Sequence, residues 1–149
     1  MVLDTKHIVD EVVKSKRDHL LIDESDKNKY KLVESKLPFK NHLHTFTVAT
    51  FVGYYSAESS YEIQDKYNGF VHLSVFRDSP YLDFLKTFAV VHENDLLVLV
   101  DEKRLFSICE GYARAGIDLL VEWIESKEDD IENIIAKCLT EKFDDLKVE

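Results

Sequence analysis

Proline and glycine are scarce in this chain: its 149 residues include only two prolines and four glycines. Sandwiches and barrels connect many short strands through tight turns, and those turns depend on both residue types. The shortage argues against such folds and favours long helices. The length is that of one domain large enough to bury its own core. We therefore predict a mainly α protein, a single-domain bundle of five to seven helices that spans residues 1–149.

Cysteine is also rare, and long apolar runs are missing. Cys109 and Cys138 fall on apolar faces of expected helices, which indicates small buried hydrophobes rather than a disulfide framework or a zinc site. No stretch approaches the roughly 18 consecutive apolar residues of a membrane-spanning helix. The N-terminus lacks the apolar segment of a signal peptide. We expect a cytoplasmic protein that does not associate with membranes.

The familiar motifs of catalysis and cofactor binding are absent from the sequence. Neither GxGxxG nor GxxxxGK[ST] occurs, so no nucleotide-phosphate loop is indicated. The serines lack the glycines of a nucleophile elbow. His42 and His44 are two potential ligands without a third, which does not make a metal site. We predict no catalytic, cofactor-binding or metal-binding residues and no cofactor, and we favour a protein that is not an enzyme.

The charge is strongly negative, with 29 acidic residues against 19 Lys and Arg and a formal net charge of −10. A duplex-binding surface needs clustered Lys and Arg to neutralise phosphates, so direct nucleic-acid binding is not expected. The charge suits a protein partner, and a basic one in particular. Assembly with further copies of the chain remains an open alternative.

The clearest helical pattern begins at Asp101, whose carboxylate can cap a first turn. Apolar side chains then recur at steps of three and four residues, which places them on one helical face. Gly111 and Gly116 interrupt this pattern, each at a cost of about 1 kcal/mol relative to Ala. We favour a break in which Gly116 is a left-handed cap. The alternative is that another helix packs against the bare backbone. Tyr112 and Trp123 are expected in the core.

Further helices are expected at residues 4–17, 25–37, 38–53 and 80–93, with an acidic helix at about 127–147. Pro38 suits the first turn of its helix, and Ser79 followed by Pro80 resembles a cap followed by a first-turn proline. Residues 30–37 could instead form a strand that returns from residues 20–22, but their Lys and Glu content favours the helix.

A minor β component is expected as well. Asn68 and Gly69 form a strong turn signal, and residues 70–76 alternate well enough for a short strand. Five apolar residues at 96–100 suit a buried strand or one turn of packed helix. We therefore allow one short β-hairpin or strand pair near residues 67–76 and 96–100.

Two segments carry a family resemblance. PFKNHLHTFTVATFVGYYS, at residues 38–56, resembles the F-K-x(5)-F-x-x-A-x-x-x-G helix of small proteins encoded beside bacterial DNA phosphorothioation (Dnd) systems. LFSICEGYARAGIDLLVEWI, at residues 105–124, is similar to that family's closing segment. The matching positions are Phe39, Lys40, Phe46, Ala49, Gly53, Phe106, Tyr112, Ala113, Gly116, Ile117 and Leu120. The resemblance implies a cytoplasmic accessory factor in defence against foreign DNA, without an assigned active site. The chain departs from the family pattern at residues 58–66, where ESSYEIQDK replaces an expected basic stretch.

These observations favour a non-catalytic protein-interaction or accessory module, which the resemblance places in a bacterial DNA-modification or anti-phage defence system. One alternative is a subunit of a nuclease or another nucleic-acid-processing enzyme, and a second is an acidic inhibitor that mimics DNA. The enzyme alternative requires a pocket that gathers several scattered polar residues. The candidates for it are Arg77, Arg104, Arg114, His92, Glu110 and Asp118, of which Arg77, Arg104, Arg114 and Asp118 are also our candidates for an interaction site or polar pocket.

Overall fold

The computed structural model describes residues 16–57 and 59–126, together with Asn133 and Ala136. This part of the chain is mainly helical, as predicted, and contains one antiparallel pair of strands. It has four α-helices rather than five to seven. The expected acidic helix at 127–147 and nearly all of the expected helix at 4–17 lie outside the described residues. The elements are β1 (His19–Asp23), α2 (Lys27–Lys36), α3 (His42–Val52), β2 (Lys66–His72), α4 (Pro80–Glu93) and α5 (Glu102–Glu125).

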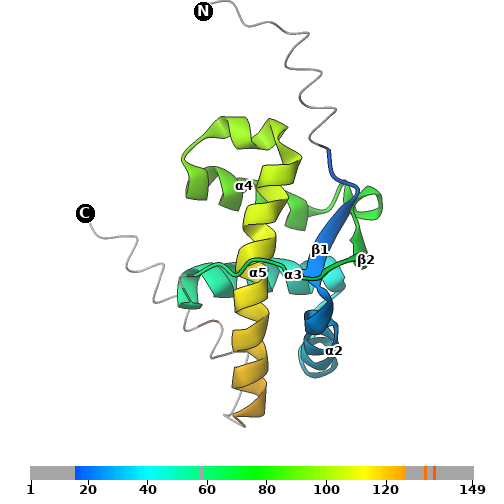
Figure 1. Cartoon of the computed structure of the whole chain (residues 1–149). Coiled ribbons are helices and arrows are strands. Elements are labelled where there is room, and N and C mark those ends of the chain that lie inside the picture. The colour runs from blue at the N-terminus through cyan, green and yellow to red at the C-terminus, as the bar shows by residue number, and fades with distance from the viewer. Residues whose placement is uncertain (1–15, 58, 127–132, 134–135, 137–149) are drawn as a thin grey trace, which may run out of the picture.

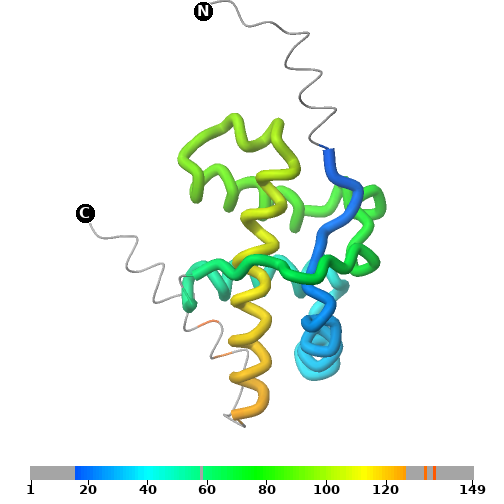
Figure 2. The backbone as a smooth tube through the Cα atoms, viewed as in Figure 1, coloured from blue at the N-terminus to red at the C-terminus, as the bar shows by residue number. Residues whose placement is uncertain are grey.

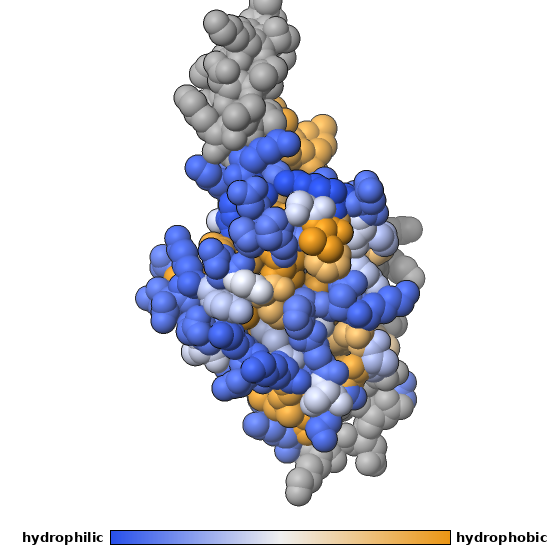
Figure 3. Space-filling view, turned by 90° about the vertical axis from the view of Figure 1, so that its right-hand side faces the viewer, coloured by the Kyte–Doolittle hydropathy of each residue, from blue (hydrophilic) through white to orange (hydrophobic). Residues whose placement is uncertain are grey.

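Helix α5 is the axis of the structure (Figure 1). Helix α3 crosses α5, α4 lies near one end of it, and the two strands with α2 lie along one side. The face that carries β1, β2 and α2 is covered mostly by hydrophilic residues (Figure 3). The largest fully buried side chains come from the four α-helices, from β1 and from the segment Leu73–Phe76. They are Tyr30, Phe46, Phe106, Leu20, Leu43, Leu73, Leu82, Leu85, Leu105, Ile117, Leu120 and Val33.

The crossing of α3 and α5 depends on two glycines. A Cβ atom at Gly116 would collide with the carbonyl group of Ala49, and one at Gly53 would collide with the carbonyl group of Tyr112. The two backbones are therefore in direct contact. Our favoured break at Gly116 is wrong, because α5 continues unbroken from Glu102 to Glu125. The close packing that we kept as the alternative is what occurs, and it offsets the low helix propensity of glycine.

The buried face of α5 includes Leu105, Cys109, Ala113, Ile117 and Leu120. Cys109 is fully buried, as expected of a small hydrophobe. Tyr112 and Trp123 are partly buried and pack against the core cluster rather than lying at its centre.

The strand pair differs from the predicted one. β1 pairs with β2, with His19 opposite His72 and Asp23 opposite Lys66. Leu20 lies opposite Val71, but Ile22 lies opposite Tyr67, so β2 has two more residues than β1 in this interval. Asn68 and Gly69 belong to this bulge and do not form a turn, so the Asn-Gly prediction is wrong. Bulges accept glycine for the same conformational freedom that turns use.

Residues 96–100, for which we allowed a buried strand or one turn of packed helix, do not form a strand. They form a short 3₁₀ helix, η4 (Leu96–Val100), capped by the side chain of Asp95, which accepts from the Leu97 N–H. The other reading that we allowed, one turn of packed helix, is closer to the structure.

Helix ends follow local capping chemistry. Ser79 caps α4 with Pro80 in the first turn, and Asn94 ends the helix in the left-handed region with φ of 53°. Asp101 caps α5 by accepting from the Arg104 N–H. The caps at Ser79 and Asp101 were predicted correctly. Pro38 does not open α3, which Asn41 caps instead. The proline acts on the residue before it: Leu37 is extended and ends α2, as residues that precede proline prefer.

We expect Gly116→Ala to lower the free energy of unfolding by about 2–3 kcal/mol, because the added methyl group must push α3 away from α5. The matched control is Gly111→Ala on the same helix, where the nearest atom is the hydroxyl of the exposed Ser60, which can rotate away. The control should be neutral or gain up to about 1 kcal/mol from helix propensity. Urea unfolding followed by circular dichroism measures both. Equal stability of the two variants would contradict a backbone contact at Gly116.

Candidate protein-interaction site

Large hydrophobic side chains are exposed on α4 and on η4. These two elements pack against each other. Leu96 and Leu97 are each 71% exposed and Val91 is 68% exposed. We call this set the α4–η4 surface; its members are Phe84, Val91, Leu96, Leu97, Leu99 and Val100. Within the described residues, only Tyr61 and Val75 are other large hydrophobes with comparable exposure.

The exposure of η4 follows from its sequence and geometry. A 3₁₀ helix has three residues per turn, so a short one that lies on the surface turns only one side inward. In η4 that side is Val98, which is 3% exposed, while the four other apolar residues face outward. Burying one large apolar side chain is worth about 1.5–3 kcal/mol. Monomeric proteins rarely leave several such groups together in water, so a contiguous apolar surface indicates a binding site.

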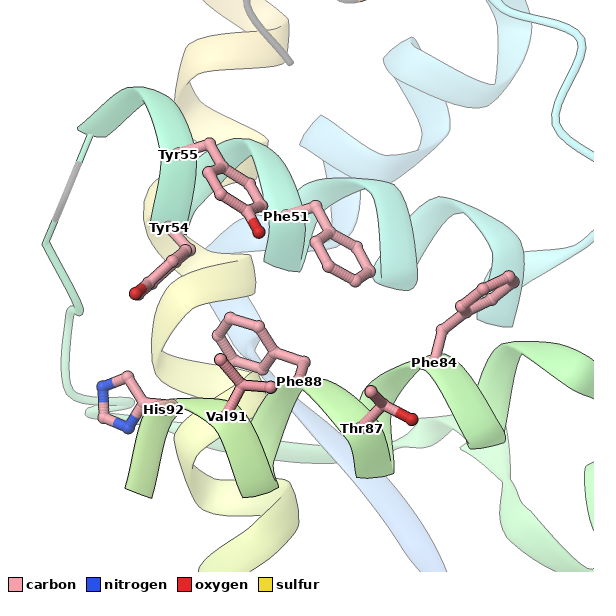
Figure 4. Close-up of a pocket in the computed structure, with 8 residues that line it drawn as sticks. All are labelled: Phe51, Tyr54, Tyr55, Phe84, Thr87, Phe88, Val91 and His92. Carbon is pink, nitrogen blue, oxygen red and sulfur yellow. The ribbon is translucent and has the colours of Figure 1, made fainter. Parts of the chain in front are cut away.

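An aromatic pocket lies beside this surface, between α4 and the end of α3 (Figure 4). We call it the aromatic socket. Its volume is about 120 Å³. Phe84 and Val91 belong to both the socket and the α4–η4 surface, so the two are continuous. The socket is lined by Phe51, Tyr54, Tyr55, Phe84, Thr87, Phe88, Val91 and His92.

Two rings of the socket, those of Tyr54 and Tyr55, belong to a π-helical turn, η2 (Gly53–Ala57), which continues α3. π-helical turns are rare and recur at functional sites. Here the turn lets two consecutive residues, Tyr54 and Tyr55, line the same pocket (Figure 4). The Tyr54 ring meets Phe88 edge-on at 5.2 Å between centroids, and Tyr55 stacks on Phe51 at 6.1 Å. These contacts fix the socket wall in one arrangement.

His92 and Arg104 belong to a polar network at the edge of the socket. His92 Nε2 is 3.0 Å from the Tyr112 hydroxyl oxygen. Its Nδ1 lies 3.4 Å from Glu93 Oε2 and has no hydrogen-bond partner among the residues that the structure describes. The other Glu93 oxygen accepts from Arg104 Nε at 2.6 Å. Burial raises the pKa of the Tyr112 hydroxyl, so it stays protonated at neutral pH.

Glu110 and Arg77 belong to a second network. Glu110, which is 4% exposed, accepts from Arg17 at 2.5 Å and from the Leu21 N–H at 2.6 Å. Arg77 donates to the Arg17 carbonyl at 3.3 Å and to the Glu102 carboxylate at 3.4 Å. This network attaches the start of β1 to α5.

Arg114 and Asp118 belong to a third network, which joins β1 and α2 to α5. Arg114 lies 3.3 Å from Asp23 Oδ2 and 3.5 Å from Asp26 Oδ2, and it donates to the Glu62 carbonyl. Lys29 bridges Asp26 at 2.8 Å and Asp118 at 2.6 Å.

The two buried carboxyl groups of this network have opposite pKa shifts. The Ser25 hydroxyl and the backbone amides of residues 64 and 65 hold the pKa of Asp23 well below its usual range. Burial raises the pKa of Asp26, although the Lys29 ammonium opposes that rise. Asp23 is thus the firmly ionised member.

The six polar residues proposed for an enzyme pocket therefore lie in three networks, two in each. Arg77 shares a network with Glu110, Arg104 with His92, and Arg114 with Asp118. In each case other residues connect the two. The candidates Arg114 and Asp118 share a network, and Arg77 and Arg104 do not belong to it. In the part of the chain that the structure describes, no three His, Cys, Asp or Glu side chains group as metal ligands would. In the same part, no helix is both long and apolar enough to span a membrane.

One protein family matches most of this chain. The family described as DNA sulphur modification system-associated protein 4 matches residues 22–149, which is most of the sequence. The chain belongs to this family. The match contains both segments on which the resemblance to Dnd-associated proteins rested, and it confirms that resemblance. Searches of curated proteins and of solved structures gave no significant match.

The family is associated with a DNA sulphur modification system, so membership in it associates this chain with such a system. The α4–η4 surface and the aromatic socket both lie inside the matched range. Sequence reasoning missed them as a site. The sequence did contain a signal for the surface. Residues 96–100 are five consecutive apolar residues between Asp95 and Asp101, a run too short for a buried helix, and no strand pattern lies beside them.

We expect Asp23→Asn to lower the free energy of unfolding at neutral pH by about 2–3 kcal/mol, because the Ser25 hydroxyl and the backbone amides of residues 64 and 65 lose a charged acceptor. The folded-state pKa of Asp23 lies below its unfolded value, so its contribution is present above about pH 4 and is lost as the pH falls further. The difference in the free energy of unfolding between wild type and variant should therefore become smaller below pH 4. Denaturant unfolding across the pH range measures it, with the exposed Asp78→Asn as control. A gap that does not change with pH would contradict the shift.

Proposed function

We propose that this protein is a non-catalytic accessory module that docks onto another protein of the DNA sulphur modification system. The observation that carries the proposal is the exposed α4–η4 surface. Protein interfaces have apolar, aromatic centres and polar rims, and their energy is concentrated in a few anchor residues. Leu96 and Leu97 have the exposure of such anchors, and the aromatic socket beside them offers a depression for an anchor of the partner.

The charges around the surface support a basic partner. Residues 78–104 contain six acidic residues against three Lys and Arg. One of the basic residues, Arg104, is already paired with Glu93. A partner that presents an apolar side chain flanked by Lys or Arg would complement both the apolar area and its rim, and electrostatic attraction would speed the encounter.

The alternative of a nuclease or other enzyme subunit has less support. It required the six scattered polar residues to share a pocket, and in the described structure they belong to three separate networks. Each network joins segments of the fold to one another, which is a sufficient physical role for these side chains.

The test is co-expression with the other proteins of the system, followed by size-exclusion chromatography with light scattering. We expect a stoichiometric complex with one of them. Leu97→Glu should raise the Kd at least about tenfold, a loss of about 1.4 kcal/mol, because it places a charge in the apolar centre. Val75→Glu is the matched control: Val75 is 74% exposed but lies on the separate segment Leu73–Phe76, so it should leave binding unchanged.

Two outcomes would overturn the proposal. One is a chain that forms no complex with any protein of the system at micromolar concentration. The other is a complex that Leu97→Glu and Val75→Glu weaken equally, since binding would then not use the α4–η4 surface.

A further inference from the structure

A larger and more polar cavity lies elsewhere on the molecule, where the segment before β2 crosses α5 (Figure 2). Its volume is about 490 Å³, within the range of about 300–1,000 Å³ that small-molecule sites occupy. It shares no lining residue with the aromatic socket. It is lined by Arg17, Leu21, Ser60, Tyr61, Glu62, Ile63, Lys66, Ser107, Glu110 and Gly111.

The cavity exists because the crossing segment is held to α5 at two points. The Tyr61 N–H donates to the Gly111 carbonyl at 3.0 Å, and the missing side chain at Gly111 makes room for Ser60. Further along, Arg114 donates to the Glu62 carbonyl. The segment is thereby fixed above α5, and the hollow remains between it, α5 and β1.

One buried carboxylate faces this hollow. Both hydrogen bonds of Glu110 use the same oxygen, Oε2, which accepts from Arg17 and from the Leu21 N–H. Its other oxygen has no hydrogen-bond partner among the described residues. An ionised carboxylate oxygen only accepts hydrogen bonds, so it would repel an anion in the hollow, whereas the protonated group carries an O–H that can donate to one.

The remaining polar groups of the lining are mainly donors. The Lys66 ammonium forms no hydrogen bond or ion pair with the described residues, and the same holds for the hydroxyl groups of Ser60 and Ser107. The charged groups that face Glu110 are Arg17 from the start of β1, Lys66 from β2 and Glu62 from the crossing segment. When Glu110 is ionised, the positive charges of Arg17 and Lys66 balance the negative charges of Glu62 and Glu110, so the cavity has no net charge. With Glu110 protonated, the cavity has one positive charge in excess and Arg17 loses its anionic partner.

We propose that this cavity binds a small oxyanion, of the phosphate or sulphate type or an ester of one, through Arg17 and Lys66, and that Glu110 takes up a proton as the anion enters. Ser60 and Ser107 would add neutral hydrogen bonds. The proposal concerns a surface apart from the α4–η4 surface and does not depend on the docking function. Burial raises the pKa of Glu110 to about 7, so the exchange takes place near neutral pH.

The test uses the full chain and sulfate as the probe, because sulfate keeps its charge across the neutral range. Isothermal titration at constant ionic strength should show binding that weakens about tenfold between about pH 6 and pH 8, as the protonated fraction of Glu110 falls. Proton uptake should appear as a binding heat that depends on the ionisation enthalpy of the buffer.

Three variants make the result specific. Glu110→Gln should bind at both pH values as tightly as wild type does at pH 6 and lose the proton uptake. Lys66→Gln should weaken binding at least about fivefold, whereas Lys31→Gln, an exposed lysine on α2, should not. Ser107→Glu, at an exposed position of α5, should abolish binding without disturbing the buried pair.

Thermal unfolding of each variant shows whether it is folded, and Ser107→Glu keeps the proposal testable if Glu110→Gln does not fold. Absence of sulfate binding at pH 6 would overturn the proposal. So would equal weakening by Lys66→Gln and Lys31→Gln, which would indicate an adventitious ion only, or a pH dependence that Glu110→Gln leaves intact.

Discussion

The contact between the backbones of α3 and α5 is the constraint on which the rest of the structure depends. Gly53 and Gly116 allow it, because a methyl group at either position would meet a carbonyl group of the other helix. The contact fixes where α3 ends relative to α5. The π-helical turn that follows, and with it Tyr54 and Tyr55, is placed against α4 for the same reason. The position of the aromatic socket therefore derives from two glycines outside it.

Buried ion pairs are a second constraint on how the elements of this fold are arranged. The apolar core joins the small sheet and α2 to α5, but apolar contacts are not directional. The pairs of Arg17 with Glu110 and of Arg114 with Asp23 add directional contacts, because each joins a residue at one end of β1 to α5. A buried ion pair contributes little net stability compared with apolar packing, but it strongly disfavours arrangements in which one partner is left alone. These pairs therefore define a unique arrangement more than they add stability.

Much of the helical structure could be predicted from the sequence because its signals are local. Ser79, Asp101 and Asn94 act within one turn of their own helices, and the apolar rhythm of α5 is visible in one stretch. Gly116 was misread because its role depends on Ala49, a distant residue that no local pattern reveals. Asn68 and Gly69 were misread because turn and bulge use the same residue types. The pairing of β1 with β2 was missed because 42 residues of helix and loop separate Asp23 from Lys66.

The α4–η4 surface and the aromatic socket were not predicted as a site, although His92, one of the predicted polar residues, lines the socket. Arg114 and Asp118, our candidates for an interaction site or polar pocket, lie outside this surface and belong to one polar network. Their partners Asp23, Asp26 and Lys29 lie far away in the sequence, so the pairing itself was not visible. The apolar run at 96–100 was visible, but whether it lies inside or outside the protein is a property of the assembled fold.

The sheet of two strands has a consequence for how the molecule opens. Two strands alone are barely stable in water, and here α5 provides the missing support through Glu110 and Arg114. If the strands detached from α5, the pair would lose this support, and the two strands would also separate from each other. The amide protons of β1 and β2 should exchange with solvent as one cooperative unit, at a free energy below that of global unfolding, while the amides around Gly116 remain protected until the whole domain unfolds.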